Sequence, residues 1–351
     1  MKLAAICFTN SGIKVLKRLK ALPLFKEDIL VLYSKCSFAE DEGGIIPVEE
    51  SLNDWTEKNF SEKDALIFVS ATGIAVRAIA PFIKDKLTDI PVIVIDESAS
   101  FVIPILSGHV GGANELSKKI ADGLNAEAVI TTATDINGKF AVDVFAKKNS
   151  LFIVNKDGIK EVSSKILAGE EILLSAPKGK VDEEKLPEGI KLTDYPPTKA
   201  DILISNNKDL NRAGIILKPR EYILGIGCKK DKDFEEILSF LSECLKEAGI
   251  EINDLYAIAS IDLKKDEEAL NMLSHYLKIP FVTFTADELN ALKGDFSSSD
   301  FVKETTGVDN ICERASLLCA GDNGKLVFKK KAGNGVTVAF AKRDWEIVFY
   351  E

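Results

Sequence analysis

Residues 106–121 read LSGHVGGANELSKKIA, and this stretch indicates how the first part of the chain folds. The apolar run at 103–106 that leads into it is typical of the end of a strand. Further on, Leu116, Ile120 and Leu124 recur at every fourth position, a spacing that predicts a helix with one face on a core. A strand, a glycine-rich turn and an amphipathic helix, in this order, predict an α/β unit.

The same alternation of apolar runs and helical patterns extends over residues 1–138. The apolar runs contain no regular polar positions, which is typical of parallel strands that helices cover on both faces. We therefore expect an N-terminal α/β domain over residues 1–138. Its expected strands are 3–8, 28–33, 65–70, 92–95, 103–106 and 128–132, and its expected helices are 12–22, 51–60, 73–83 and 113–124.

Two further units follow in the sequence. We expect residues 139–216 to form a smaller middle unit, in which the polar stretch 176–199 is interpreted as a surface connector. Residues 217–351 begin with the strand YILGIGC (222–228) and continue as a C-terminal α/β domain. The expected fold class is therefore multi-domain α/β, with mostly parallel sheets flanked by helices.

Composition excludes several classes of protein. The net charge of −10 argues against a nucleic-acid surface and against an anionic membrane. The apolar runs are far too short to span a bilayer, and no signal-peptide pattern is present, so we expect a cytoplasmic protein. Six cysteines without a CxxC pair and only two histidines make a zinc site or another protein metal site unexpected.

His109 lies inside the glycine-rich turn and is the first candidate for catalysis. An imidazole is a base near neutral pH, glycines let a backbone approach a ligand, and a helix start offers amide hydrogens. The alternative is a histidine that is hydrogen-bonded within its turn. The residues that would surround a ligand here are Ser107, Gly108, Gly111 and Gly112, with Asn114 and Glu115 either contacting it or capping the helix.

The segment SATGIAVRAIAP, residues 70–81, is the second candidate. Thr72 and Gly73 follow a strand and open a helix, where they would cradle an anion or merely form a tight turn with a capping threonine. We expect Arg77 in the first turn of that helix, where its charge opposes the helix dipole. An anionic partner for Arg77 is therefore expected.

Further polar residues follow predicted strands, where ligands of parallel sheets bind. Thr132 and Asp135 belong to ITTATD, residues 130–135, and Asp135 either orients His109 or caps the next element. In the C-terminal domain, LGIGCKK lacks the third glycine of a dinucleotide motif, and it contains Cys228 and Lys229. The candidates Glu313 and Arg314 either bind a ligand or form a local ion pair.

Together these motifs resemble the cobalt-precorrin-5A hydrolases of anaerobic cobalamin biosynthesis. The resemblance runs in order through nearly the whole chain, except for 139–216, and the family's GCRRG is GCKKD here, at 227–231. The segments that carry it are 70–81 (SATGIAVRAIAP), 106–115 (LSGHVGGANE), 131–135 (TTATD), 225–230 (GIGCKK), 259–262 (ASID) and 312–319 (CERASLLC).

The resemblance implies a hydrolase whose substrate is a cobalt-bearing corrinoid. Water opens the δ-lactone of its ring-A acetate, the C20 fragment leaves as acetaldehyde, and cobalt-precorrin-5B remains. Cobalt belongs to the substrate, so no protein cofactor is expected. A homodimer and transient contacts with neighbouring methyltransferases of the pathway are open expectations. The alternatives are a corrinoid carrier without activity and a nucleotide-dependent enzyme, which the missing phosphate motifs disfavour.

For this chemistry we expect His109 to activate water, and the amides of Gly111 and Gly112 to hold the oxyanion. Asp135 or Glu97 would orient the imidazole. The substrate carries many carboxylates, so Arg77, Lys229 and Arg314 are the expected cationic contacts. The other expected substrate contacts are Thr72, Gly73, Ser107, Gly108, Asn114, Glu115, Thr132, Cys228 and Glu313.

Overall fold

The apolar runs of the N-terminal part form one seven-stranded sheet in the order β3-β2-β1-β4-β5-β6-β7. Strands β1 to β5 are parallel, β6 is antiparallel to β5, and β7 is parallel to β6. The strands are β1 (Lys2–Cys7), β2 (Ile29–Ser34), β3 (Ile45–Pro47), β4 (Ala65–Val69), β5 (Val92–Ile95), β6 (Phe101–Leu106) and β7 (Glu127–Ala128).

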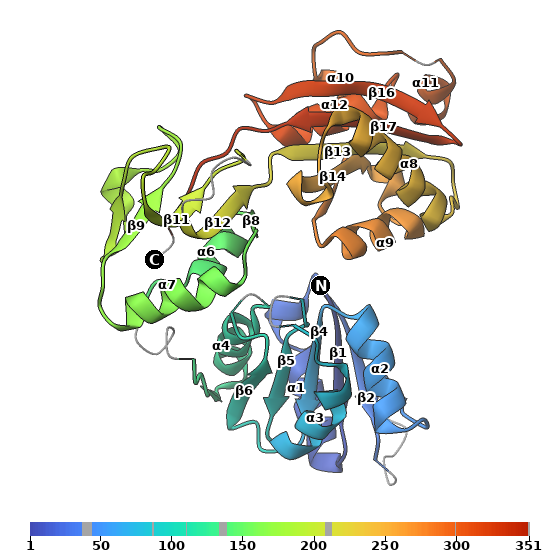
Figure 1. Cartoon of the computed structure of the whole chain (residues 1–351). Coiled ribbons are helices and arrows are strands. Elements are labelled where there is room, and N and C mark those ends of the chain that lie inside the picture. The colour runs from blue at the N-terminus through green and yellow to red at the C-terminus, as the bar shows by residue number, and fades with distance from the viewer. Residues whose placement is uncertain are drawn as a thin grey trace. The chain divides into compact units, whose positions relative to one another are not determined.

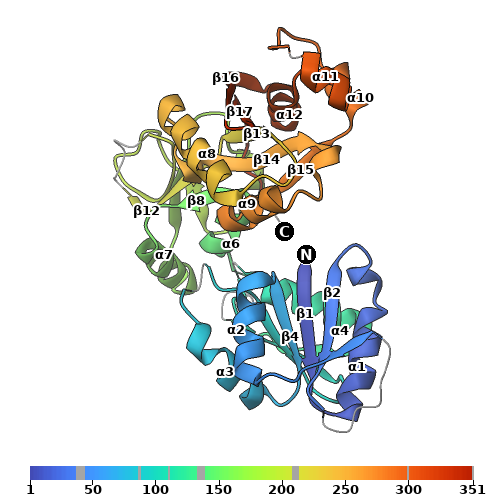
Figure 2. The ribbon, with the colours of Figure 1, turned by 90° about the vertical axis from the view of Figure 1, so that its right-hand side faces the viewer.

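Helices cover both faces of this sheet, as the periodicity predicts. Figure 2 shows α1 (Asn10–Lys20) and α4 (Ala113–Leu124) on one face, and α2 (Leu52–Glu62) and α3 (Thr72–Ile79) on the other. Each face has its own apolar core, with Leu16 and Ile120 on the first and Trp55 on the second. The short helices η1 (Pro23–Phe25) and η2 (Ala80–Phe82) complete this part.

The direction of β6 determines where the glycine-rich turn lies. Leu106, the last residue of β6, pairs with Val92 at the start of β5, and Val102 pairs with Ile95 at its end. The turn after Leu106 therefore lies at the edge of the sheet where β4 and β5 begin. The loops that follow β1, β4 and β5 lie at the opposite edge.

A second sheet has the order β10-β9-β11-β12-β8, with β8 antiparallel to β12 and the other pairs parallel. Its strands are β8 (Leu151–Ile153), β9 (Ile172–Ser175), β10 (Ile190–Leu192), β11 (Ala200–Ile204) and β12 (Ala213–Pro219). The helices of this region are α6 (Val142–Lys148), α7 (Asp157–Leu167) and the short η3 (Glu183–Lys185).

The third sheet has the order β15-β14-β13-β17-β16, and β17 is antiparallel to both neighbours. Helices α8 and α9 pack on one face and α10 and α12 on the other (Figure 1). The elements are β13 (Tyr222–Cys228), α8 (Phe234–Ala248), η4 (Ile252–Asp254), β14 (Leu255–Ile261), η5 (Asp262–Lys264), α9 (Glu268–Leu277), β15 (Phe281–Phe284), α10 (Ala286–Ala291), α11 (Asp300–Thr306), α12 (Ile311–Ala320), β16 (Lys325–Gly333) and β17 (Val336–Lys342).

This computed structural model describes residues 1–36, 44–85, 88–109, 111–132, 139–207, 213–298 and 300–349. No helix in these ranges is long and apolar enough to cross a membrane. The contacts divide the chain into two compact units, Met1–Val144 and Phe145–Glu351. The predicted α/β class with mostly parallel sheets is confirmed, whereas the domain boundaries at 138 and 216 stay a prediction.

Gly225 shows how closely α12 approaches the third sheet. A β-carbon at Gly225 would lie 1.8 Å from the carbonyl oxygen of Cys312 in α12, so only glycine fits. We expect Gly225→Ala to lower the free energy of unfolding by about 1–3 kcal/mol or more, because the helix must move. Thermal unfolding measures this, with Gly73→Ala as the control, since its β-carbon would meet nothing closer than 3.6 Å. Equal melting temperatures for wild type and Gly225→Ala would disprove the close packing.

Candidate functional site

The turn between β6 and α4 satisfies its own amide groups. The amide of Gly112 donates to the carbonyl of His109 at 3.0 Å, and those of Ala113 and Asn114 donate to Ser107 and Gly108 at 3.1 and 3.0 Å. These carbonyls thereby cap the start of α4. The Gly112 amide hydrogen is thus engaged within the turn. The oxyanion contact expected from this amide stays a prediction, and it requires that this hydrogen bond be shared or broken.

The other small and polar residues of the turn build its shape. A β-carbon at Gly111 would lie 2.3 Å from that of Ser107, and Gly112 has a φ of +91°, so both positions require glycine. The Ser107 hydroxyl donates to the carbonyl of Asp89 at 2.7 Å. The buried amide of Asn114 donates to the Thr132 hydroxyl at 3.1 Å. Thr132 thus lies beside the turn, and its predicted contact with substrate stays a prediction.

His109 faces a carboxylate that the sequence reasoning missed. Its Nδ1 lies 3.5 Å from Oδ2 of Asp143, in the first turn of α6, and only 19% and 10% of the two side chains are exposed. A carboxylate at Nδ1 fixes the ring's orientation and stabilises its protonated form. The other ring nitrogen, Nε2, lies on the far side of the ring. This is the arrangement of a general base with its orienting acid.

The charge of Asp143 follows from its surroundings. Burial raises the pKa of the Asp143 carboxyl, but the hydrogen bond and charge of His109 and the amide of Val144 outweigh burial. The net pKa lies below the ordinary carboxyl value, so Asp143 is ionised at neutral pH. An ionised carboxylate stabilises the imidazolium that forms when an imidazole acts as a base.

The two acids that the sequence nominated have different positions. Asp135 lies outside the described residues. Glu97 accepts a hydrogen bond from the Thr9 hydroxyl at 2.9 Å, at the edge where β1 and β5 end. The acid found beside His109 is instead Asp143, and its only signal in the sequence was an acidic residue in the first turn of a helix. The roles of Asp135 and Glu97 stay predictions.

Thr72, Gly73 and Arg77 lie at the opposite edge from His109, because they follow β4. Arg77 falls in the last turn of α3, not the first, so its charge suits the helix dipole and that argument for an anionic partner fails. The Arg77 guanidinium lies over Gly73 at the start of the helix, where a β-carbon added to Gly73 would be 3.6 Å from Nη1 of Arg77. Arg77 is exposed, and no carboxylate within the described ranges pairs with it. The predicted substrate residues thus form two groups at two edges.

Glu313 and Arg314 both form hydrogen bonds and ion pairs within the fold. The Glu313 carboxylate is fully buried and accepts from the Ser297 amide and hydroxyl at 3.0 and 2.9 Å and from the Lys330 amide at 2.6 Å. Arg314 pairs with Asp309 at 2.8 Å and donates to two carbonyls, those of Leu289 and Leu292. The Glu313 contacts join α12 to β16 and to Ser297, and the Arg314 contacts join it to α10 and Asp309. Substrate binding by either residue stays a prediction.

The remaining predicted substrate contacts are Cys228, Lys229 and Glu115, and each of them has interactions within the fold. Burial raises the pKa of the Cys228 thiol to about 11, so it is protonated at neutral pH and unsuited to be a nucleophile. The Lys229 amide donates to the Gly335 carbonyl at 2.9 Å. Glu115 is exposed and pairs with Lys119 at 2.7 Å, one turn along α4. Substrate binding by these residues stays a prediction.

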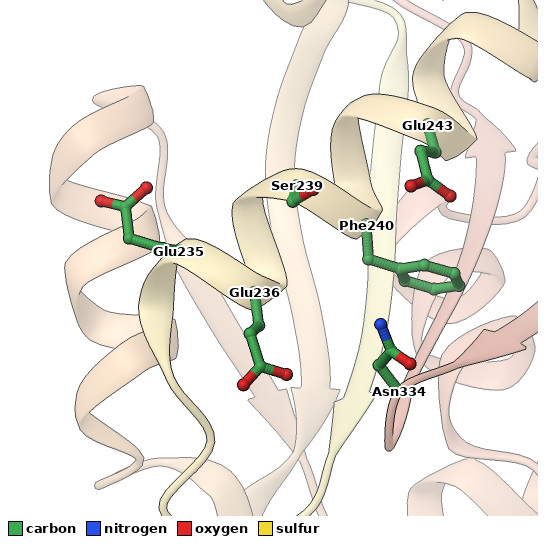
Figure 3. Close-up of a pocket in the computed structure, with 6 residues that line it drawn as sticks. All are labelled: Glu235, Glu236, Ser239, Phe240, Glu243 and Asn334. Atoms are coloured by element: carbon green, nitrogen blue, oxygen red, sulfur yellow. The ribbon is translucent and has the colours of Figure 1, made fainter.

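A hollow on α8 does not suit a substrate rich in carboxylates. It has a volume of about 270 Å³. Figure 3 shows three glutamates of α8 beside it, with Phe240 and Asn334 facing each other at one end. Their negative charges would repel a polycarboxylate. The residues that line it are Glu235, Glu236, Ser239, Phe240, Glu243 and Asn334.

The lowered pKa of Asp143 predicts how stability changes with pH. A carboxyl whose pKa is lower in the folded state than in the unfolded state stabilises the fold when ionised. We expect wild type to be more stable than Asp143→Asn at neutral pH. This difference should shrink as the pH falls below about 4, where the carboxylate becomes protonated. Urea unfolding from pH 3 to pH 7 measures it, and a difference independent of pH would contradict the pairing.

Comparisons with known proteins agree with the motifs. The family models described as Cobalamin synthesis G N-terminal and Cobalamin synthesis G C-terminus match residues 54–135 and 222–341. The cobalt-precorrin-5A hydrolase of Salmonella typhimurium is 34% identical, over 96% of each chain. That of Priestia megaterium is 30% identical, over 96% of this chain and 94% of the relative.

The solved structure of a cobalamin biosynthesis protein G homologue from Sulfolobus solfataricus is 23% identical, with a TM-score of 0.41, over 98% of this chain and 97% of that one. The two sequence relatives match over 96% of this chain, which includes most of the residues between the two family-model regions. The chain therefore belongs to the cobalamin synthesis G family, that of the cobalt-precorrin-5A hydrolases.

Proposed function

We propose that this chain hydrolyses cobalt-precorrin-5A. Water opens the δ-lactone of the ring-A acetate, the C20 fragment leaves as acetaldehyde, and cobalt-precorrin-5B is the corrinoid product. The observation that carries this assignment within the molecule is the His109–Asp143 pair, whose histidine lies in the turn that also carries the family resemblance. The full-length relatives that bear this name support the substrate.

In this proposal His109 is the general base. Asp143 faces Nδ1 at 3.5 Å, so the ring is oriented to take a proton from water through Nε2. The imidazolium that forms is stabilised by the ionised carboxylate. The amides of Gly112, Ala113 and Asn114 are engaged in the turn, so holding the oxyanion with them requires that these hydrogen bonds be shared or broken.

We also propose that cobalt enters only with the substrate and that the protein has no cofactor of its own. The scattered cysteines, which include no CxxC pair, support this. A cytoplasmic location is supported by six cysteines that are all thiols, which suits a reducing compartment. Homodimer formation and transient contact with pathway methyltransferases belong to the same proposal.

Replacing the histidines tests the assignment. We expect purified protein, supplied anaerobically with cobalt-precorrin-5A, to release acetaldehyde, and His109→Ala to lose at least about 100-fold in kcat, the usual contribution of a general base. The matched control is His275→Ala, since the chain has only two histidines and His275 is exposed on α9. Full activity of His109→Ala would show that His109 is not the general base. Substrate binding by wild type without aldehyde release would indicate a carrier.

Arg77 gives a prediction that concerns binding. Its exposed guanidinium, for which the described residues provide no carboxylate, suits a peripheral carboxylate of the corrinoid. We expect Arg77→Glu to raise KM about 10-fold at low ionic strength, with kcat nearly unchanged, because one charge-assisted contact is worth roughly 1.5 kcal/mol. The effect should weaken in 0.5 M salt. An unchanged KM would exclude Arg77 from substrate binding.

A further inference from the structure

Strand β6 exposes apolar side chains on the face of the first sheet that α2 and α3 cover. Phe101, Ile103 and Ile105 alternate along β6, so they share one face of the sheet. Ile103 pairs with Val94 of β5, a residue of the buried core beneath α3. Ile103 and Ile105 are only partly buried, and Phe101 is 45% exposed. On this face β6, which lies beside β5 in Figure 1, is therefore less covered than its neighbour.

Helix α3 adds apolar side chains that lie outside its own core stripe. Val76 is 48% exposed, and Ile83, the residue after η2, is 46% exposed. The buried residues of α3 are Ala75, Ala78 and Ile79, and they pack in the same core cluster as Ile103 and Ile105 of β6. Exposed apolar side chains on adjoining elements are typical of a binding surface. We define the β6 surface as Val76, Ile83, Phe101, Ile103 and Ile105.

The β6 surface extends between the two groups of predicted substrate residues. It begins at the edge of Thr72, because Val102 pairs with Ile95 at the end of β5 and Thr72 follows β4 to that same edge. It ends at the other edge, where β6 runs directly into the turn that contains His109. A strand of six residues spans about 17 Å between its first and last residue. One large ligand along β6 thus reaches both groups.

The far end of α3 meets the same turn through Asp89. The Asp89 carboxylate accepts from the amide of Lys84, the residue after Ile83, at 2.9 Å. The Asp89 carbonyl accepts from the Ser107 hydroxyl at 2.7 Å. Asp89 is buried, so this link is shielded from water. The helix side and the strand side of the β6 surface therefore converge on the turn of His109.

The two segments that build the β6 surface contain no acidic residue. Residues 70–84 and 101–114 lack Asp and Glu, although 55 of the 351 residues of the chain are acidic. The first segment adds two exposed cations, Arg77 and Lys84. Asp96, the acid closest to β6 in the sequence before it, directs its carboxylate to the amides of Ser100 and Phe101 at 2.8 and 2.6 Å. Such a surface complements an apolar ligand that carries carboxylates.

We propose that the β6 surface binds the ring of the substrate: a flat, apolar macrocycle lies on β6 and α3, one of its carboxylates meets Arg77, and its reacting end reaches His109. This inference rests on the proposed function and deepens it. It names the side chains that hold the apolar part of the corrinoid, whereas the sequence motifs indicate only polar residues and glycines. It also explains how one substrate contacts residues at two edges of the sheet.

Binding to the full chain is measured by calorimetry with cobyrinic acid, a stable corrinoid whose side chains end in free carboxylates, and with its fully methyl-esterified form. We expect Val76→Asp and Phe101→Asp each to raise the Kd of the acid at least about 10-fold, because each removes apolar contact and adds a repelling charge. Arg77→Met should weaken binding of the acid but not of the ester, since the ester has no carboxylate for the guanidinium.

Ile46→Asp is the matched control. Ile46 is 49% exposed, much like Val76 and Phe101, but it lies in β3 at the far edge of the sheet from β6. We expect it to bind cobyrinic acid as wild type does. Val76 and Phe101 lie on different elements, so one variant tests the surface if the other does not fold. A wild-type Kd in folded Val76→Asp or Phe101→Asp protein would overturn the inference.

Light scattering and acetaldehyde release on the same samples distinguish the remaining outcomes. A wild-type dimer that both Asp variants dissociate, with an unchanged Kd for cobyrinic acid, would assign the surface to a second copy of the chain and overturn the inference. Raised Kd values in a protein that releases no aldehyde would sustain the surface and reject the hydrolase. Aldehyde release with a wild-type KM for cobalt-precorrin-5A in both variants would sustain the hydrolase and reject the surface.

Discussion

The reversal of β6 determines how the N-terminal unit presents its chemistry. Because β6 runs antiparallel to β5, the LSGHVGG turn reaches the edge where β5 begins, and α4 starts there. Thr132 follows β7 to the same edge, and Asp143 meets His109 there. In an all-parallel sheet the turn would lie beside Thr72 and Arg77. One strand direction thus decides which residues lie together at one edge of the sheet.

The polar groups of the candidate sites differ in their hydrogen-bond and ion-pair partners. Glu313 and Arg314 have hydrogen-bond partners in β16, in α10 and in the segments around Ser297 and Asp309, and the start of α4 is capped by carbonyls of its own turn. Such groups stabilise the fold, because a buried charge is costly unless it is paired. His109 and Asp143 are different: they form one pair that brings together two elements far apart in the sequence.

Hydrophobic patterning was sufficient to predict the α/β class, the covered sheets and the helix after LSGHVGG. It could not predict the direction of β6, since an apolar run looks the same whichever way it is paired. It also missed Asp143, because an acidic residue at the start of a helix is common there and is explained by its favourable interaction with the helix dipole. Arg77 was placed in the first turn of a longer helix, whereas α3 ends at Ile79. The first two errors concern tertiary pairing, and the third concerns where a helix ends.

The most direct test of the His109 assignment is chemical rescue. His109→Ala is assayed for acetaldehyde release from cobalt-precorrin-5A with increasing imidazole in the buffer, beside wild type. If His109 supplies the base, imidazole should restore part of the lost turnover in the variant, in proportion to its unprotonated form, and leave wild type unchanged. A variant that is inactive at every imidazole concentration but still binds substrate, or one that is fully active without imidazole, would contradict the account.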